Sequence, residues 1–146
     1  MNPLSQTDFD KLQGVWSQTY LEADGIIEPP NDEHTAPGAV CIFEGNEFRV
    51  VTPDNTLLLI GTFELDATTT PKAITWVDSI SEDAGKALPA IYELTDKTFR
   101  FIEADEGKPR PTHFKTVAGL TMREFVRVDL VPSRLACART QIASVN

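Results

Sequence analysis

KLQGVW, residues 11–16, joins a polar N-terminal leader to the first segment that has the pattern of a β-strand. Within it Gly14 and Trp16 lie two positions apart, and alternate residues of a strand face the same side of a sheet. One of only two tryptophans in the chain therefore shares a face with a residue that has no side chain. At the start of the first expected strand, the pair therefore places a glycine, which exposes its backbone, beside the largest side chain.

Eight segments of the chain have the composition of β-strands. Each is rich in β-branched or aromatic residues and is bounded by residues that favour turns. No long stretch with helical periodicity separates them, so we do not expect parallel strands connected by helices. The expected strands span residues 14–21, 39–43, 47–52, 56–65, 73–78, 87–94, 98–103 and 120–128. Before them, Thr7 or Asp8 is a candidate N-cap for a short helical turn that ends at Leu12.

The lengths of the connections favour a closed barrel. If each strand runs antiparallel to the one before, the longest links share one end of the sheet: 22–38, 79–86 and 104–119. The short or moderate links that alternate with them share the other end: 44–46, 66–71 and 95–96. Eight antiparallel strands can close into a barrel that has no free edges and encloses room for one small ligand. We therefore predict an all-β, eight-stranded, antiparallel up-and-down barrel with a short N-terminal helical turn, closed at the end with the short links.

Size and composition fit a single domain. The chain has 146 residues, of which 41% are hydrophobic and 24% are charged, as is usual for a globular protein. We expect the barrel domain to span residues 1–131, and a C-terminal tail, disordered or forming a short helix, to span residues 132–146. The formal net charge of −9 would repel a phosphate backbone, so nucleic acid is not an expected partner.

Neither a membrane helix nor a secretory signal is visible in the sequence. The longest apolar run, residues 57–60, is far shorter than the roughly 20 residues that a membrane helix needs. Residues 1–12 lack the basic and apolar regions of a signal peptide, which predicts a cytoplasmic location. Cys41 and Cys137 are then expected to be free thiols, and a disulfide between them is the alternative for a secreted protein.

Gly14-x-Trp16, preceded by a helical turn and followed by a series of eight expected strands, resembles the lipocalin and wider calycin pattern. In that group the tryptophan packs at the closed end of the barrel, beneath an arginine of the last strand. The resemblance implies structural roles for Gly14, Trp16 and Arg127, with Arg123 as the poorer candidate for the arginine.

A closer resemblance covers residues 8–128. The segments LQGVW, GTFELD…PKAITW, AIYEL and GKPRPTHF resemble the motifs of an uncharacterised lipocalin-like bacterial domain family that is abundant in planctomycetes. That family has no settled reaction, so the resemblance implies a fold and not a particular chemistry.

Alternation along the expected strands identifies candidate ligand-binding residues. The positions expected to face the barrel interior include Gln18, Tyr20, Leu59, Trp76, Tyr92, Phe101 and Met122. One interpretation is an aromatic cavity with a few polar groups that orient a ligand. The alternative is a filled barrel in which these side chains form the core, since an eight-stranded barrel has the size at which either outcome occurs.

Residues 107–114, GKPRPTHF, are the most unusual segment. Two prolines restrict its backbone, and we expect Arg110 and His113 to project from it at the mouth of the barrel. There they would hold a carboxylate or phenolate, through a bidentate guanidinium and an imidazole that titrates near neutrality. In the alternative, Arg110 pairs with a local acid such as Asp105 or Glu106.

A metal or haem site is a weaker interpretation. His34 lies in another long link, from which it would meet His113 across the mouth, but two histidines without short-range spacing are a poor metal signature. The last strand has no histidine to serve as a haem ligand. We therefore expect no metal and no cofactor.

Two classes of function fit this pattern, and a third is weaker. The first is binding of a small, mostly apolar or amphipathic molecule inside the barrel. The second is an enzyme that uses the same cavity for cyclisation or isomerisation, by shape and by acid–base catalysis with His113, Arg110 or Glu103. No nucleophile motif such as GxSxG or CxxC occurs in the sequence. The third is a protein-interaction domain with a filled core.

Overall fold

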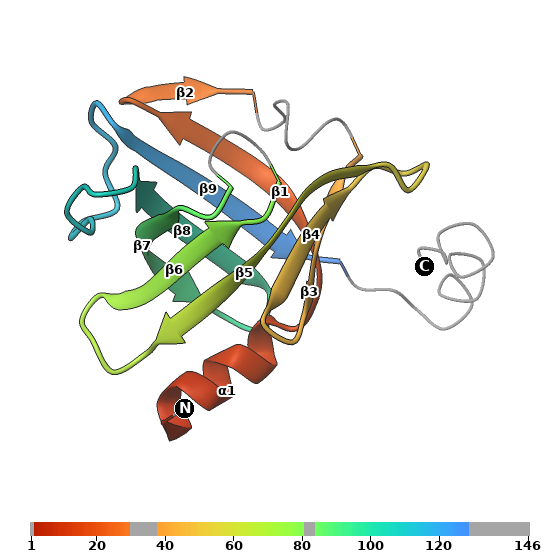
Figure 1. Cartoon of the computed structure of the whole chain (residues 1–146), viewed down its shortest axis with the longest axis horizontal. Helices are drawn as coiled ribbons and strands as arrows, with labels where there is room; N and C mark the ends of the chain where they lie inside the picture. The colour runs from red at the N-terminus through yellow and green to blue at the C-terminus, as the bar shows by residue number, and fades with distance from the viewer. Residues whose placement is uncertain (1, 30–37, 81–83, 129–146) are drawn as a thin grey trace.

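A closed eight-stranded antiparallel β-barrel, preceded by one short helix, forms the fold (Figure 1). The computed structural model describes residues 2–29, 38–80 and 84–128. The elements are α1 (Pro3–Leu12), β1 (Gly14–Ala23), β2 (Ile26–Glu28), β3 (Val40–Glu44), β4 (Glu47–Val51), β5 (Leu57–Asp66), β6 (Lys72–Asp78), β7 (Ala87–Leu94), β8 (Thr98–Ala104) and β9 (Leu120–Arg127). The predicted fold class is confirmed, and the ends of the eight expected strands differ from the observed ones by at most two residues.

Pairing between β1 and β9 closes the barrel. The closing ladder runs from Trp16 opposite Arg127 to Ala23 opposite Thr121. The opposite edge of β1 pairs with β3 through its first residues and with β2 through its last ones. The strand β2 was not predicted, because its three residues are too few to show alternation and its two adjacent isoleucines do not alternate with polar residues.

The helix α1 is longer than the predicted helical turn and begins at a different cap. Asn2 is the N-cap, and its Oδ1 accepts a hydrogen bond of 2.8 Å from the backbone N–H of Ser5. Pro3 follows at the first helical position, where the N–H that proline lacks would have no partner in the helix. Thr7 and Asp8, the predicted caps, lie inside the helix because the Asn-Pro pair starts it several residues earlier.

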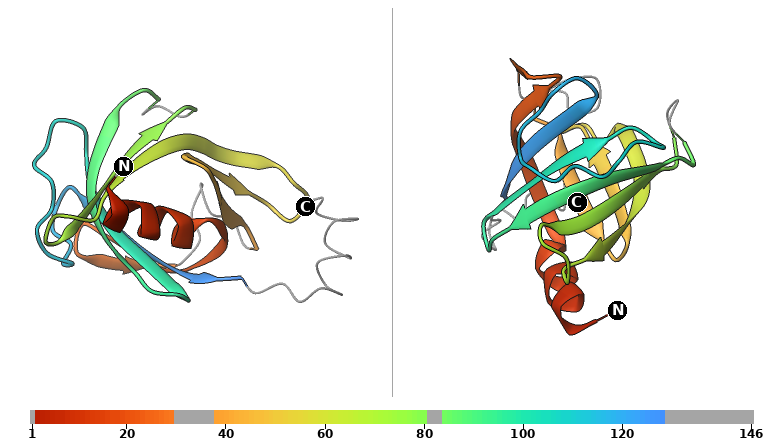
Figure 2. Two further views of the ribbon diagram at one scale, coloured as in Figure 1. Left: turned by 90° about the horizontal axis from the view of Figure 1, so that it is seen from below. Right: turned by 90° about the vertical axis from the view of Figure 1, so that its left-hand side faces the viewer.

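One end of the barrel is covered by α1, as the left view of Figure 2 shows. Phe9 stacks on Phe63 of β5, with 5.8 Å between the ring centroids. Ser5, which is fully buried, accepts a hydrogen bond of 2.8 Å through its hydroxyl from the backbone N–H of Ala67. The helix is therefore held to the barrel by both ring stacking and a buried polar contact, and we call this end the closed end.

A buried carboxylate provides a second attachment of α1 to the closed end. Asp8 accepts hydrogen bonds from the hydroxyl of Tyr92 at 2.7 Å and from the ammonium group of Lys72 at 2.9 Å. Burial, followed by the hydrogen bond to Asp8, raises the pKa of Tyr92 above its ordinary value. The Tyr92 hydroxyl therefore stays protonated and donates a hydrogen bond to the Asp8 carboxylate of the helix.

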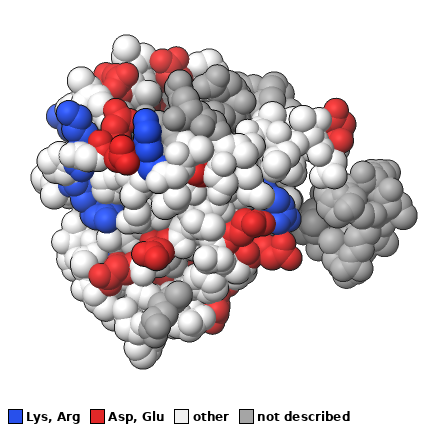
Figure 3. Space-filling view, in the orientation of Figure 1, with Lys and Arg blue, Asp and Glu red and all other residues white. Residues whose placement is uncertain are grey.

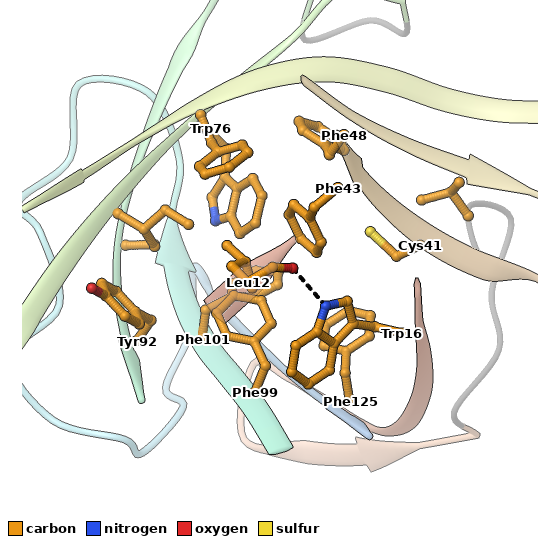
Figure 4. Packing of buried hydrophobic residues seen from close by; sticks show 14 of the residues in the cluster. Leu12, Trp16, Cys41, Phe43, Phe48, Trp76, Tyr92, Phe99, Phe101 and Phe125 are labelled. Carbon is orange, nitrogen blue, oxygen red and sulfur yellow. Dashed lines mark hydrogen bonds between the residues drawn. The ribbon is translucent and has the colours of Figure 1, made fainter. Parts of the chain in front are cut away.

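Trp16 is fully buried beside the end of α1. Its indole N–H donates a hydrogen bond of 2.8 Å to the carbonyl of Leu12, the last helical residue (Figure 4). The guanidinium of Arg127 lies 4.3 Å from the centroid of the indole ring and donates to the carbonyl of Gln13 at 2.9 Å. Gly14 has a φ of +119°, and a Cβ there would lie 3.0 Å from Nη1 of Arg127. The bare backbone two residues before the tryptophan therefore gives the arginine room to reach its partners.

The link between β8 and β9, residues 105–119, lies along the outer wall of the barrel. Arg110 donates hydrogen bonds through Nη1 to the carbonyls of Ile74 (2.8 Å) and Ala90 (2.7 Å), cross-strand partners in β6 and β7. Phe114 packs against an apolar cluster on the outer face. The prediction that Arg110 and His113 project at the mouth is wrong, because contacts with the wall hold this link against the strands.

The same link is joined to the end of β1 and to the turn between β1 and β2. Glu22 accepts hydrogen bonds from the hydroxyls of Thr116 and Tyr20, the latter at 2.6 Å, and these bonds lower the pKa of the Glu22 carboxyl. The carboxylate of Asp24 accepts a hydrogen bond of 2.7 Å from the backbone N–H of Gly119. The link is thus fixed at its C-terminal part as well as at Arg110.

Charges of both signs are interspersed on the face of the molecule drawn in Figure 3. On the outer wall, Arg49 of β4 forms ion pairs with Glu44 at 3.0 Å and Glu47 at 3.2 Å. No helix among the described residues has the length and apolar character needed to cross a membrane.

Candidate ligand-binding site

A pocket of about 160 Å³ lies inside the barrel, in the half away from α1, which we call the distal half. Every barrel strand contributes at least one residue to its wall. The lining residues are Gln18 (β1), Cys41 and Phe43 (β3), Phe48 and Val50 (β4), Leu59 (β5), Trp76 and Asp78 (β6), Leu88 (β7), Phe101 and Glu103 (β8), and Thr121, Arg123 and Phe125 (β9). Leu12, Trp16 and Tyr92 at the closed end are not among them, so the interior is filled at that end and hollow in the distal half.

Aromatic rings form much of the pocket wall. Trp76 contacts both Phe48 and Phe101, with ring centroids 5.2 and 4.7 Å from its own. Phe125 stacks on Phe101 at 6.0 Å, and Phe43 lies 6.1 Å from Trp76. Figure 4 shows these rings converging from different strands. A wall of this kind suits a flat apolar group.

Polar side chains occupy the part of the wall formed by β8, β9 and β1. Glu103 and Thr121 lie directly opposite each other in the ladder between β8 and β9. Arg123, two residues nearer the closed end, donates a hydrogen bond of 3.0 Å from Nη1 to Oε1 of Gln18. A further carboxylate, Asp78, lines the pocket from β6. The pocket therefore combines an aromatic wall with a polar one.

Cys41 lies in the lining, but its surroundings keep the thiol protonated. Burial raises the pKa of the Cys41 thiol to about 12, although the charge of Arg123 acts in the opposite direction. The thiolate is the reactive form of cysteine. At neutral pH this position therefore supplies a small apolar surface and not a nucleophile.

Half of the functional candidates that lie in the described part of the chain line the pocket. These are Gln18, Leu59, Trp76, Phe101 and Glu103. The remaining candidates among the described residues do not: Tyr20, Tyr92, Arg110, His113 and Met122.

Tyr20 and Met122 face outward because of the local register of β1 and β9. The pairing of these strands shifts between Gln18 and Tyr20, and one extra residue in β1 reverses the face on which Tyr20 lies. In β9 the residues at 121 and 123 line the pocket, so Met122 between them points outward and packs in the outer apolar cluster.

Tyr92, Arg110 and His113 lie away from the pocket for reasons of tertiary structure. Tyr92 points inward but at the closed end, where its hydroxyl is bonded to α1. Arg110 and His113 belong to the link on the outer wall. His113 is exposed, and its Nδ1 lies 2.9 Å from the hydroxyl of Thr112.

Some predictions concern residues outside the described part of the chain. These are His34, Cys137 and the tail at 132–146. Within residues 2–29, 38–80 and 84–128, no group of three or more His, Cys, Asp or Glu side chains is placed to hold a metal ion. The two-histidine hypothesis and the role of the tail stay predictions.

Arg123 and Asp78 were not predicted as pocket residues. Alternation of side chains along the strands would have placed both in the interior. Asp78 lies two positions after Trp76, which lines the pocket. Arg123 lies four positions before Arg127, whose guanidinium stacks on the inward-facing indole of Trp16. Arg123 was considered only as a substitute for Arg127 in that stack. Other lining residues outside the earlier candidates are Cys41, Phe43, Phe48, Val50, Leu88, Thr121 and Phe125.

Comparisons of the chain with protein-family models, with curated proteins and with solved structures found no match. The assignment of a function therefore depends on the geometry of the barrel and its pocket.

Proposed function

We propose that the protein binds a small, mostly apolar molecule in the distal half of the barrel, and that it is lipocalin-like. The observation that carries the binding proposal is a pocket whose wall takes residues from all eight barrel strands. The indole of Trp16 under Arg127, with Gly14 beside them, supports the lipocalin-like assignment because that arrangement is the one the resemblance implies.

The size and lining of the pocket restrict the ligand. A cavity of about 150 Å³ lined by apolar side chains accommodates one benzene molecule. The volume of about 160 Å³ therefore fits one ring or a short branched chain, with aromatic faces on one side. Burying roughly 150 Å² of apolar surface stabilises such a complex by about 4 kcal/mol, which corresponds to a dissociation constant of about 1 mM for the ring alone.

Binding is better supported than catalysis. Of the three residues considered for acid–base chemistry, Glu103 lines the pocket, whereas Arg110 and His113 lie on the outer wall. Cys41 is held as a thiol. The pocket therefore does not bring together the acid–base residues that were predicted from the sequence, although a second carboxylate, Asp78, lines it in addition to Glu103.

If the ligand binds in this pocket, a larger side chain in its wall should weaken the binding of a ring-sized probe. Leu59 lines the pocket, whereas its neighbour Ile60 lies on the outer face opposite Arg49. We expect Leu59→Trp to weaken binding of benzyl alcohol at least tenfold, because the indole occupies the space of the ring. Ile60→Trp, the matched control, leaves the affinity within twofold of the wild type. Ligand-observed NMR titration measures both.

Equal affinity of the wild type and Leu59→Trp for benzyl alcohol would place the probe outside the barrel. The expected dissociation constant is about 1 mM. If the wild type bound no benzyl alcohol at a probe concentration of about ten times this value, the proposed function would be contradicted directly.

A further inference from the structure

The indole N–H of Trp76 is a buried hydrogen-bond donor that has no partner among the described residues. Trp76 lines the pocket. The other indole, that of Trp16, donates to the carbonyl of Leu12 (Figure 4). Nearly all buried polar groups of folded proteins have a hydrogen-bond partner, because an unpaired one destabilises the fold. The unpaired N–H of Trp76 therefore needs an explanation, and its place in the pocket wall suggests one.

We infer that the ligand is a small aromatic compound with a carbonyl group, and that Trp76 donates a hydrogen bond from its indole N–H to the carbonyl oxygen. This inference rests on the proposed function, since it specifies the ligand of the same pocket. An indole N–H is a donor and never an acceptor, so the group that pairs with it must be an acceptor.

Aromatic rings surround Trp76 on both sides. The rings of Phe48 and Phe101, which line the pocket, lie 5.2 and 4.7 Å from the indole. The rings of Phe63 and Phe99, which do not line the pocket, lie 6.0 and 6.3 Å from it. Trp76 therefore stands between the pocket and the filled part of the barrel, and an acceptor that is not part of the protein approaches it from the pocket.

Packing, and not hydrogen bonding, holds the indole of Trp76 in place. Its nitrogen is covered by neighbouring side chains, so an acceptor contacts it when the indole turns or its neighbours shift. This movement breaks no hydrogen bond of the N–H, whereas a turn of Trp16 would break the bond to Leu12. A carbonyl compound thus gains a hydrogen bond that the protein itself does not provide at Trp76.

The charged side chains of the lining favour an uncharged ligand. Arg123 donates a hydrogen bond of 3.0 Å to Gln18. The polar residues of this part of the wall all take part in further interactions within the protein: Gln18, Asp78, Glu103 and Arg123. A charged ligand in a largely apolar pocket needs an opposite charge to offset the loss of its hydration. A carbonyl oxygen is an uncharged acceptor and needs none.

Benzaldehyde and styrene test this inference, because they share one ring and differ only by an oxygen atom in place of a CH₂ group. In two-dimensional ¹H–¹⁵N NMR spectra of the wild type, we expect both probes to shift the indole resonance of Trp76. Benzaldehyde should move the proton shift further downfield than styrene does, since a hydrogen bond to oxygen deshields the proton. The spectrum of Trp16→Phe, which lacks the other indole resonance, assigns the two.

Trp76→Phe removes the donor and keeps an aromatic ring in the wall. Styrene is the more apolar probe, so the affinity for benzaldehyde is divided by that for styrene in each protein. We expect this ratio to fall about tenfold in Trp76→Phe. Trp16→Phe is the matched control, the same substitution at an indole that does not line the pocket, and should leave the ratio within twofold of the wild type.

Equal proton shifts of Trp76 with benzaldehyde and styrene overturn this inference and leave the proposed function intact. A ratio that stays unchanged in Trp76→Phe, or that falls equally in Trp16→Phe, does the same. The spectra need no substitution at position 76, so they decide the question even if Trp76→Phe fails to fold. Binding of neither probe overturns both proposals.

Discussion

Gly61→Ala lowers the free energy of unfolding by about 3 kcal/mol or more, at the upper end of what overpacking a core costs. A Cβ at position 61 would lie 2.3 Å from the carbonyl oxygen of Val77 and 2.7 Å from Cε1 of Phe48. One of these atoms is backbone of the paired strand β6, and the other belongs to a buried ring in the pocket wall, so neither moves without disturbing the barrel. Urea-induced unfolding measures the loss.

Thr62→Ala is the control for this substitution. Thr62 is the next residue of β5 and is exposed, so its truncation changes stability by about 0.5 kcal/mol or less. If Gly61→Ala were as stable as Thr62→Ala, Phe48 would not be packed on the backbone of β5, and the pocket wall described above would be incorrect.

Trp16→Ala is expected to cost about 3–5 kcal/mol, the usual loss for deleting a fully buried large aromatic side chain. The substitution removes the ring that supports Arg127 and leaves the carbonyl of Leu12 without its donor. It also removes the contact with Phe99, whose ring centroid lies 6.0 Å from that of the indole. The closed end would therefore lose both its packing and its attachment to α1.

Trp16→Phe separates the ring from its N–H group. Phenylalanine keeps an aromatic face for Arg127 but cannot donate to Leu12, so we expect a smaller loss of about 1–2 kcal/mol. Thermal unfolding of both variants gives the order. A Trp16→Ala protein as stable as Trp16→Phe would mean that the indole does not seal the barrel.

The strands of this fold were predictable because each carries its own local signal. Segments such as AITWV at 73–77 are rich in β-branched and aromatic residues, and turn formers separate them. The closure of the sheet was predicted from link lengths, since the three longest links all fall at one end of an antiparallel series of strands. β2 was missed because it has only three residues, too few for the two isoleucines that follow Asp24-Gly25 to show the alternation of a longer strand.

The orientation of individual side chains was less predictable, because it depends on interruptions that leave no mark in the sequence. The register shift in β1 between Gln18 and Tyr20 is one extra residue, and neither residue type indicates it. Arg110 was placed at the mouth because its link leaves β8 at the distal end. Its actual position depends on contacts with the carbonyls of Ile74 and Ala90, which are distant in sequence.

Whether a barrel contains a pocket depends on how its side chains pack, and the pattern of apolar and polar residues in the sequence does not reveal this. Sequence alternation identified Trp76 and Phe101 as interior residues, but it did not distinguish a filled barrel from a hollow one. Leu12, Trp16 and Tyr92 fill the closed end, whereas the rings of Phe48, Trp76 and Phe101 border a pocket in the distal half. This division depends on how large side chains from different strands meet.

The central claim is that small molecules bind inside the distal half of the barrel, and the two indole N–H groups test it most directly. Trp76 lines the pocket, and Trp16 is sealed at the closed end, bonded to Leu12. In two-dimensional ¹H–¹⁵N NMR spectra, titration with benzyl alcohol should shift the indole resonance of Trp76 progressively to saturation and leave that of Trp16 in place. A resonance of Trp76 that does not move while the probe binds, or a shift confined to Trp16, would contradict the account.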